Sequence, residues 1–303
     1  MAQKSLEFKL IDWIFSYLKK DNLDFDLGDD STVLDFHSKK TVISVDSFVE
    51  DTHFNNFVPL DAVGFRSIAG ACSDIVAMGI KPEFVFVSIG LKKNPQKTLK
   101  EIYKGIKKAC KKWHLKVGGG DIVKSSKIFL SITAVGWGKN PVKRTGAKEG
   151  DLIFITGFPG LSEAGLRCLL KKRKNEKLIR FFLYPEIYPE VALKIAPFVN
   201  CMIDSSDGLF KSLLILSQLN GLKFKIESKK IPVNSLLLNF AKTHKQALKI
   251  ALTGGEDYNL IGTVSPDKFD KIKGELFVIG KVEKGKGVYL DGKKISMRSF
   301  EHF

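Results

Sequence analysis

The segment SDIVAMGIKPEFVFVSIGL, Ser73 to Leu91, joins an acidic motif, the end of a helix and a buried strand in one short run. In residues 60–78 Ala, Ile and Val recur at helical spacing, which predicts a helix that ends at Gly79. Pro82 closes this unit because proline cannot continue a helix. The apolar run 83–91 then predicts a buried strand.

The alternation of helix and strand continues on both sides of this segment. Apolar spacing predicts an N-terminal helix over 5–20, a basic helix is predicted over 97–113, and residues 118–121 are expected to form a sharp loop. Further strands are expected at 41–45, 127–136, 152–156, 222–227, 258–264 and 276–282, and further helices from 161 and over 186–197, 208–220 and 234–243. This alternation predicts an α/β or layered α+β fold.

One segment stands out as a candidate boundary between two halves of the chain. Residues 138–150 are rich in Gly, Lys and Pro, and strand-like patterns resume directly after them. A chain of 303 residues is long enough for two domains. We therefore predict one domain over 1–138 and a second over 139–303.

Composition and charge narrow the class of protein. The chain is 44% hydrophobic with a formal net charge of +16, but its Lys residues are spread along the sequence without a nucleic-acid motif, so no dedicated nucleic-acid partner is expected. The N-terminus lacks a signal-peptide core, and apolar runs such as 84–91 fall far below the ~20 residues of a membrane span. A cytoplasmic location without a membrane partner is expected.

The four cysteines form no CxxC pair and are interpreted as small buried side chains.

Acidic residues cluster with glycine in short turns of this basic chain. These motifs are Gly28-Asp29-Asp30, Asp46, Asp51, Ser73-Asp74, Gly120-Asp121, Asp204–Gly208 and Gly254–Asp257. Each one alone is explained equally well as a turn or a helix cap. If the motifs converge in space, their oxygens suit Mg²⁺, which would bridge a bound triphosphate. The chain has no GxxxxGK[ST] loop, no protein-kinase motif set and no GxSxG elbow, so metal ions are the expected substitute for a P-loop.

The motifs also form an ordered series. In sequence order they are GDD (28–30), SVDSFVEDTHF (44–54), SDIVAMGIKP (73–82), GGGD (118–121), KRTGAKEGD (143–151), MIDSSDGL (202–209), GGEDY (254–258) and FEHF (300–303). This series, which covers nearly the whole chain, resembles the thiamine-monophosphate kinase family of the aminoimidazole ribonucleotide synthetase superfamily. The resemblance implies a two-domain PurM-like fold. Its N-terminal half binds ATP and Mg²⁺ and pairs its strands in a homodimer, and its C-terminal half is a second α/β unit.

The same resemblance implies a reaction, the transfer of a phosphoryl group from ATP to thiamine monophosphate, which completes thiamine diphosphate biosynthesis. We expect direct in-line transfer, because the acceptor phosphate is already ionised at neutral pH and needs no strong general base. Both reactants are anionic, so several Mg²⁺ ions and an arginine are expected to offset their repulsion. No covalent phosphoenzyme is expected.

The resemblance assigns roles to residues position by position. Mg²⁺ would be bound by Asp30, Ser44, Asp46, Asp74, Asp121, Asp204 and Asp207. ATP would be bound by Tyr103, Gly120, Asp121, Arg144 and Ser206. Thiamine monophosphate would be bound by His53, Glu256 and Phe300. Asp207 and Arg144 are the expected catalytic residues.

Four of these residues have an ordinary structural alternative. The fork of Arg144 matches phosphate oxygens, but it could also form a salt bridge between the halves. Tyr103 could be plain packing on a basic helix, and His53 could be structural, although its neighbours match the family's acid-x-His-Phe pattern. Phe300 could be a core aromatic near the end of the chain.

The chain departs from the pattern of the family at two sites, which comprise three residues. Val45 stands where the family often has Thr, which removes one hydroxyl beside Asp46. Ile122 and Val123 replace the usual hydroxyl pair after GGD, which leaves fewer polar groups near the phosphates. Neither change removes a carboxylate, so metal binding is still expected.

Two rival functions stay open. The first is another enzyme of the superfamily. Selenophosphate synthetases carry a reactive Cys near the N-terminus and hydrogenase maturation relatives end in Cys, whereas the first cysteine here is Cys72 and the last residue is Phe303. The purine-pathway enzymes fit the SDxxAMG and GGEDY motifs less well. The second rival is a basic, non-catalytic polyanion binder, which would gain from losing the acidic motifs that this chain keeps.

Overall fold

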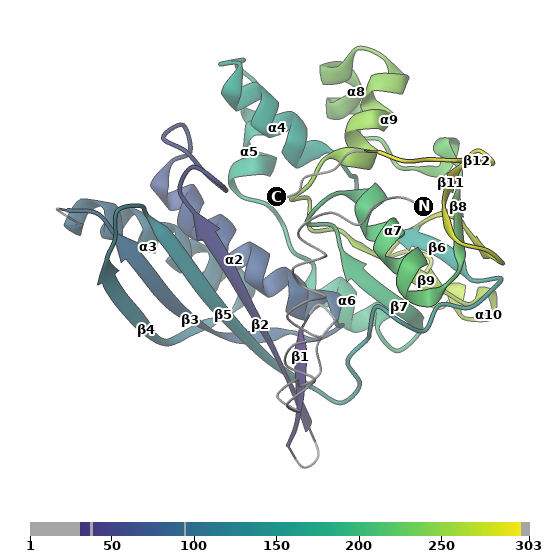
Figure 1. Ribbon diagram of the computed structural model, residues 1–303, viewed down its shortest axis with the longest axis horizontal. Helices are drawn as coiled ribbons and strands as arrows, with labels where there is room; N and C mark the ends of the chain where they lie inside the picture. The colour runs from purple at the N-terminus through teal and green to yellow at the C-terminus, as the bar shows by residue number, and fades with distance from the viewer. Residues whose placement is uncertain (1–30, 37–38, 94, 298–303) are drawn as a thin grey trace, which may run out of the picture.

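The computed structural model describes residues 31–36, 39–93 and 95–297, which fold around two β-sheets lying side by side (Figure 1). The first sheet has five strands in the order β1-β2-β5-β3-β4. They are β1 (Thr32–Phe36), β2 (Lys39–Val49), β3 (Pro82–Leu91), β4 (Lys116–Lys124) and β5 (Phe129–Gly138). Neighbouring strands are antiparallel except for β3 and β4, which run parallel. The expected helix over 5–20 lies outside the described residues.

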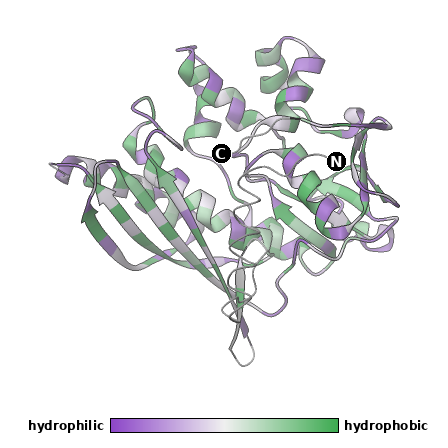
Figure 2. Ribbon diagram, in the orientation of Figure 1, coloured by the Kyte–Doolittle hydropathy of each residue, from purple (hydrophilic) through white to green (hydrophobic). Residues whose placement is uncertain are grey.

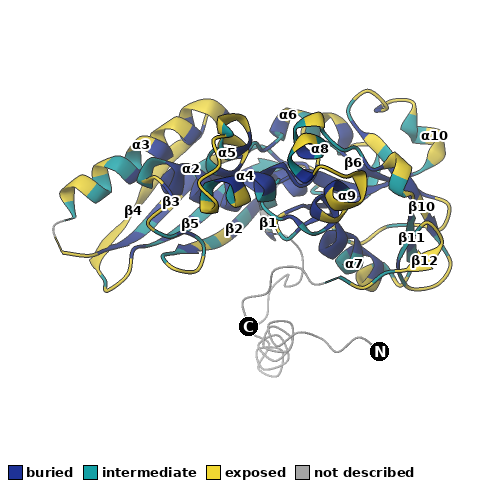
Figure 3. Cartoon of the chain, turned by 90° about the horizontal axis from the view of Figure 1, so that it is seen from above, coloured by how far each residue is buried: buried dark blue, intermediate teal, exposed yellow. Residues whose placement is uncertain are grey.

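Two helices accompany the first sheet. α2 (Leu60–Ala77) lies against β2 and β5, and α3 (Gln96–Trp113) packs beside it. α2 is buried along almost its whole length, whereas α3 turns a basic face to solvent (Figure 3). The helices predicted over 60–78 and 97–113 and the strand predicted over 83–91 are therefore confirmed.

The glycine-rich residues 118–121 were expected to form a sharp loop, and this prediction is wrong. They lie inside the edge strand β4, which pairs with β3 and whose register shifts between Val85 and Phe86. A Cβ atom on Gly120 would lie 1.9 Å from the carbonyl oxygen of Val87. The glycine is needed because the two backbones come too close for a side chain, and not because the chain turns here.

The second sheet has seven strands in the order β12-β11-β8-β10-β6-β9-β7. They are β6 (Leu152–Ile155), β7 (Val199–Asp204), β8 (Lys223–Ile226), β9 (Leu260–Val264), β10 (Phe277–Glu283), β11 (Gly287–Leu290) and β12 (Lys293–Lys294). The helices are α4 (Leu161–Leu170), α5 (Glu176–Leu183), α6 (Pro189–Ile195), α7 (Leu209–Asn220), α8 (Ser235–Ala241), α9 (His244–Thr253) and α10 (Pro266–Phe269), with the 3-10 turn η1 (Ser228–Lys230). The sequence pattern predicted β6, β8, β9, β10, α4, α6, α7 and α8, but not α5, β7, η1, α9, α10, β11 or β12.

The chain passes from the first sheet to the second between Gly138 and Leu152, inside the expected boundary segment. The hydrophobic core does not stop there, because one buried cluster joins α2 to Phe182 of α5 and Met202 of β7. Apolar strands and helices accordingly face one another across the seam (Figure 2). The division into two domains, 1–138 and 139–303, stays a prediction.

The four cysteines and the helices agree with the expectations from composition. All four cysteines are buried, which confirms them as small packing side chains, and burial raises the pKa of the Cys110 thiol to about 11. Of the helices that the structure describes, none combines the length and the apolar character needed to cross a membrane.

The close approach of α2 and α3 yields a stability prediction. A Cβ on Gly105 of α3 would lie 1.7 Å from the backbone oxygen of Asp61 in α2, so Gly105→Ala must push the helices apart. We expect a loss of about 2 kcal/mol in the free energy of unfolding, measured by urea denaturation, despite the better helix propensity of Ala. Gly274→Ala is the control, because no atom lies within 4 Å of its added Cβ. Equal stability of the two variants would contradict the packing argument.

Candidate active site

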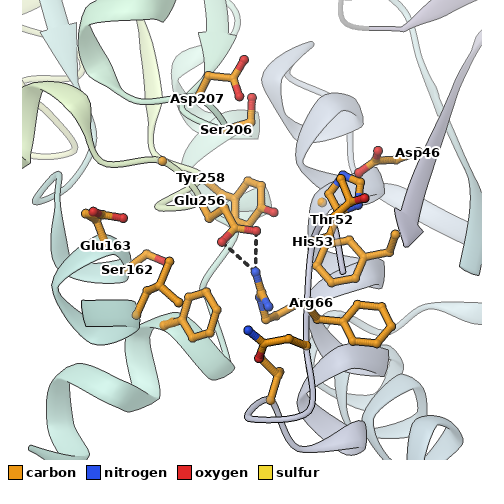
Figure 4. A pocket seen from close by; sticks show the side chains of 18 of the residues that line it. Asp46, Thr52, His53, Arg66, Ser162, Glu163, Ser206, Asp207, Glu256 and Tyr258 are labelled. Atoms are coloured by element: carbon orange, nitrogen blue, oxygen red, sulfur yellow. Dashed lines mark hydrogen bonds and ion pairs between the residues drawn. The ribbon is translucent and has the colours of Figure 1, made fainter. Parts of the chain in front are cut away.

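A cavity of about 500 Å³ lies between the two halves of the chain, beside α2 (Figure 4). The N-terminal half contributes the end of β2, the loop after it and one face of α2. The C-terminal half contributes α4, α5 and the loops over 204–208 and 254–258. The cavity therefore gathers segments that are far apart in the sequence.

One wall of the cavity is acidic. Asp46 lies on β2, Asp74 on α2, and Asp204 and Asp207 at and after the end of β7. A Cβ on Gly70 of α2 would lie 2.8 Å from Oδ2 of Asp46, so the helix leaves room for this carboxylate. The four carboxylates come from three separate segments of the chain and line one cavity. A shared metal site requires this convergence of the acidic motifs.

Serine hydroxyls connect these carboxylates to the scaffold. Oγ of Ser44 donates a hydrogen bond of 2.5 Å to Oδ2 of Asp74. Oγ of Ser73 donates a hydrogen bond of 2.6 Å to Oδ2 of Asp204, and this bond is buried. Because Ser73 belongs to α2 and Asp204 to β7, the second bond joins the two halves of the chain at the acidic wall.

The surroundings of Asp204 favour its neutral form. Burial raises the pKa of this carboxyl, and the neighbouring charges of Asp207 and Asp46 raise it further. The hydrogen bond from Ser73 and the positive charge of Arg144 act in the opposite direction. A bound cation would favour the ionised form of the whole group, because it would offset the repulsion among the carboxylates.

The donor atoms of this wall fit magnesium. Carboxylate and hydroxyl oxygens are the hard ligands that Mg²⁺ prefers, and Mg²⁺ usually takes one or two carboxylates together with water and substrate phosphate. Among the described residues, no three His, Cys, Asp or Glu side chains are grouped closely enough to hold a metal ion by themselves. The wall therefore suits ions whose coordination is completed by water and phosphate.

A second group of lining residues, the apolar wall, is hydrophobic. It is formed by Phe48, Phe54, Val58, Leu166, Leu169, Leu170 and Phe182. His53 also lines the cavity, and its ring stacks on Phe48 with 5.2 Å between centroids. Nδ1 of His53 accepts a hydrogen bond of 3.0 Å from the backbone N–H of Val49, which fixes the orientation of the ring.

Arg66 and Glu256 meet across the cavity floor (Figure 4). Nη2 of Arg66 donates to both carboxylate oxygens of Glu256, at 2.6 and 2.7 Å. Sequence reasoning assigned Glu256 to the substrate but missed Arg66. The sequence signal that could have identified Arg66 is an arginine in the middle of a helix whose other buried residues are small or apolar, where a charge needs a partner.

The loop that carries Glu256 is held against the loop of Asp204–Gly208. The backbone N–H of Glu256 donates to the carbonyl oxygen of Ser206 at 2.7 Å, and that of Tyr258 donates to Ser205. Glu256 and Tyr258 both have positive φ angles, 61° and 49°, which are uncommon for residues other than glycine. The two loops therefore form one unit, and its packing sustains a strained backbone.

Asp257 anchors the same loop to α4. Its carboxylate accepts hydrogen bonds from the backbone N–H groups of Gly160, at 2.5 Å, and Ser162, at 2.9 Å, at the start of the helix. Burial raises the pKa of Asp257 to about 7, although these hydrogen bonds act to lower it. Asp257 is thus a fixed attachment of the cavity wall and not one of its lining groups.

A second cation that sequence reasoning missed lies beside the acidic wall. Nζ of Lys211, in the first turn of α7, pairs with Oδ2 of Asp207 at 2.9 Å, and Lys211 is buried. The spacing of four residues places both side chains on one face of the helix start, which is the signal that could have identified it. Asp207 therefore pairs with Lys211 through one carboxylate oxygen and also lines the cavity.

Other expected site residues lie away from this cavity. Gly120, the residue before Asp121, is in register with Asp46 across the sheet, but three inter-strand spacings, about 14 Å, separate them. Tyr103 lines a different hollow of about 510 Å³ between α3 and β4, with Lys107 and Lys111. A single copy of the chain does not bring these residues to the acidic wall.

The remaining expected residues are placed as follows. Ser206 lines the cavity, and its Oγ donates a long hydrogen bond of 3.4 Å to Asp204. Arg144 lies near enough to Asp204 to lower the pKa of its carboxyl, and the backbone oxygen of Arg144 accepts a hydrogen bond from Asn220. Asp30 and Phe300 lie outside the described residues.

Comparison with known proteins links this architecture to a family. A family model described as AIR synthase related protein, N-terminal domain, matches residues 28–137. The thiamine-monophosphate kinase of Aquifex aeolicus (strain VF5) is 35% identical over 305 residues, which cover 98% of this chain and 98% of that protein.

Solved structures agree with the sequence comparison. A structure of AaThiL complexed with AMPPCP and TMP covers 100% of both chains at 32% identity, with a TM-score of 0.91. The thiamine-monophosphate kinase of Stenotrophomonas maltophilia K279a is 25% identical, covers 96% of this chain and 98% of its own, and has a TM-score of 0.81. With its PurM-like mixed α/β architecture and its full-length match to these enzymes, this chain belongs to the thiamine-monophosphate kinase family.

Proposed function

We propose that this chain transfers the γ-phosphoryl group of ATP to thiamine monophosphate in the cavity between its two halves, with magnesium at the acidic wall. The observation that carries this proposal is the division of the cavity into an acidic wall and an apolar wall. Thiamine monophosphate has the same division, because its heteroaromatic rings are joined to a phosphate. The rings fit the apolar wall, and the phosphate then lies at the acidic wall, where the γ-phosphate of Mg²⁺-bound ATP is expected.

The residues of the acidic wall have two roles in this proposal. Asp46, Asp74, Asp204 and Asp207 hold Mg²⁺, with Ser44 fixing the orientation of Asp74. Bound Mg²⁺ neutralises phosphate charge and orients the two reactants. Arg144, which lies near Asp204, adds a fixed positive charge on the same side. Since the acceptor phosphate is already ionised, no side chain has to remove a proton, and transfer is direct and in line.

We further propose that a second copy of the chain completes the site. Apolar side chains on β2, β3 and β4 are exposed on one face of the first sheet, namely Val45 (64%), Phe86 (41%) and Val123 (40%). An apolar sheet face with an open edge strand of this kind is typical of a surface that another copy covers. Such a homodimer would supply Tyr103, Gly120 and Asp121 to the neighbouring acidic wall.

The activity is tested by mixing the pure protein with ATP, Mg²⁺ and thiamine monophosphate. We expect ADP and thiamine diphosphate as products. Asp46→Asn and Asp207→Asn should each lower kcat by at least about a hundredfold, because they weaken charge stabilisation at the reacting phosphates. Asp270→Asn is the matched control, since its side chain is 84% exposed and far from catalysis in this proposal, and it should keep full activity.

Three results would contradict parts of this proposal. Near-normal turnover of Asp46→Asn would remove that residue from the metal site. Radioactive phosphate that stays on the denatured protein after incubation with labelled ATP would replace direct transfer with a phosphoenzyme. Turnover only with another acceptor would keep the fold family but change the substrate.

The homodimer is tested by sedimentation of the wild type and of Phe86→Glu. The added carboxylate should block pairing of the apolar face, because burying it without a partner is costly, and we expect a monomer with little activity. Leu219→Glu is the control, because Leu219 is also exposed (46%) but lies on α7, away from that face. A wild type that is monomeric and fully active would disprove the dimer.

A further inference from the structure

Arg66 is the largest fully buried side chain of the described residues, and it lines the candidate active site. Only 1% of the side chain is exposed, although it carries a full positive charge. Burying a charge is strongly unfavourable unless the charge is paired. The arrangement around Arg66 therefore has to explain why α2, whose other buried residues are small or apolar, carries an arginine at this position.

The guanidinium group is fixed on two sides by aromatic rings. It lies 4.0 Å from the ring centre of Phe182 on α5 and 5.0 Å from that of Phe48 on β2. Contacts of this kind restrict the orientation of the guanidinium plane, and the N–H groups at its edge stay able to donate hydrogen bonds. Within the part of the chain that the structure describes, Nε and Nη1 have no hydrogen-bond acceptor, so the polar contacts of the group run through Nη2.

Within the described residues, Nη2 makes its hydrogen bonds to Glu256, and it contacts both carboxylate oxygens. A carboxylate has about four lone-pair positions, so the two bonds leave acceptor capacity on Glu256. The side chain of Glu256 is 29% exposed and lines the cavity, so this capacity is accessible to a bound molecule. Arg66 thus restrains the carboxylate without blocking it.

The backbone of Glu256 also points to a role beyond packing. The residue has a φ angle of 61°, and its N–H is bonded to Ser206, so the strained loop aims the side chain into the cavity (Figure 4). Strain of this kind persists only where surrounding contacts sustain it, and it is common at ligand-binding sites. The loop and Arg66 therefore fix the same carboxylate from two sides.

We propose that Arg66 is a positioning residue for the acceptor. It holds Glu256 so that the carboxylate accepts a hydrogen bond from an N–H donor on a heteroaromatic ring that lies along Phe48 and Phe182. This inference rests on the proposed function, because the amino group on the pyrimidine ring of thiamine monophosphate supplies such a donor. Since Arg66 neutralises Glu256, the ring is recognised by a directed hydrogen bond more than by net charge.

The competing explanation is that the ion pair only fastens the two halves together. Arg66 belongs to α2 and Glu256 to the loop before β9, so the pair does bridge the seam. If the ion pair only joins the two halves, its removal would lower the stability of the fold and leave substrate affinity unchanged. A positioning role would change the affinity for the acceptor and leave the affinity for ATP unchanged, because the acidic wall does not include Arg66.

Four variants separate these explanations. Arg66→Met keeps an unbranched apolar side chain without the charge, and Arg66→Lys keeps the charge, although its ammonium ends one bond short of the position of Nη2. Glu256→Gln and the double variant Arg66→Met/Glu256→Gln complete a double-mutant cycle. The measurements are KM for thiamine monophosphate, KM for ATP, the Kd of thiamine monophosphate by calorimetry, and Tm.

We expect Arg66→Met to raise both KM and Kd for thiamine monophosphate by at least about tenfold, as for a lost hydrogen bond to a charged group. KM for ATP should stay within about twofold. Arg66→Lys should lie between Arg66→Met and the wild type, because it keeps the charge but loses the planar group that stacks on Phe48 and Phe182. The double variant should bind thiamine monophosphate no more weakly than Glu256→Gln alone, because Arg66 acts through Glu256.

The proposal is overturned if Arg66→Met lowers Tm but leaves KM and Kd unchanged, or if the two substitutions have additive effects. If Arg66→Met does not fold, Glu256→Asp tests the same idea. It keeps both charges but withdraws the carboxylate by one methylene, so an unchanged KM for thiamine monophosphate would also overturn the proposal. A wild type that makes no thiamine diphosphate would instead overturn the proposed function, and this inference with it.

Discussion

The buried hydrogen bond from Ser73 to Asp204 ties α2 to the end of β7, and the cavity depends on this junction. The same helix carries Gly70, which leaves room for Asp46, and Arg66, which pairs with Glu256. Positions 66, 70 and 73 are spaced by four and three residues, so they share one face of the helix. A single face of α2 therefore organises the acidic wall, the seam between the halves and the carboxylate on the cavity floor.

The net charge of the chain and the local charge of the cavity have opposite signs. The chain has a net charge of +16, yet the cavity wall gathers Asp46, Asp74, Asp204 and Asp207. In the proposed function, the net positive charge would attract the anionic reactants over long range, while the local carboxylates would favour the cations that accompany phosphate. Lys211 beside Asp207 supplies a fixed positive charge at this wall. The excess of lysine and the acidic motifs therefore act at different distances and do not conflict.

The sequence predicted the parts of this molecule that depend on local pattern. Helical spacing predicted α2 and α3. The family resemblance grouped Asp46, Asp74, Asp204 and Asp207, which do line one cavity, but it also grouped Asp121 with them, and a single copy of the chain does not bring that residue there. The prediction failed where contacts between distant segments decide the structure. The glycines at 118–121 serve the close pairing of β4 with β3, and this distant contact is not visible in local turn propensity. Arg66 was missed for the same reason, since its partner Glu256 is 190 residues away.

The central claim is that metal-bound ATP and the acceptor meet at the acidic wall between the halves. Crystals grown with Mn²⁺ in place of Mg²⁺, a non-hydrolysable ATP analogue and thiamine monophosphate test it directly, because Mn²⁺ is located by its anomalous scattering. The account predicts Mn²⁺ bound by the carboxylates of Asp46, Asp74 and Asp204, with the acceptor rings against Phe48 and Phe182. Mn²⁺ and nucleotide bound elsewhere, with these carboxylates still contacting only protein groups, would contradict it.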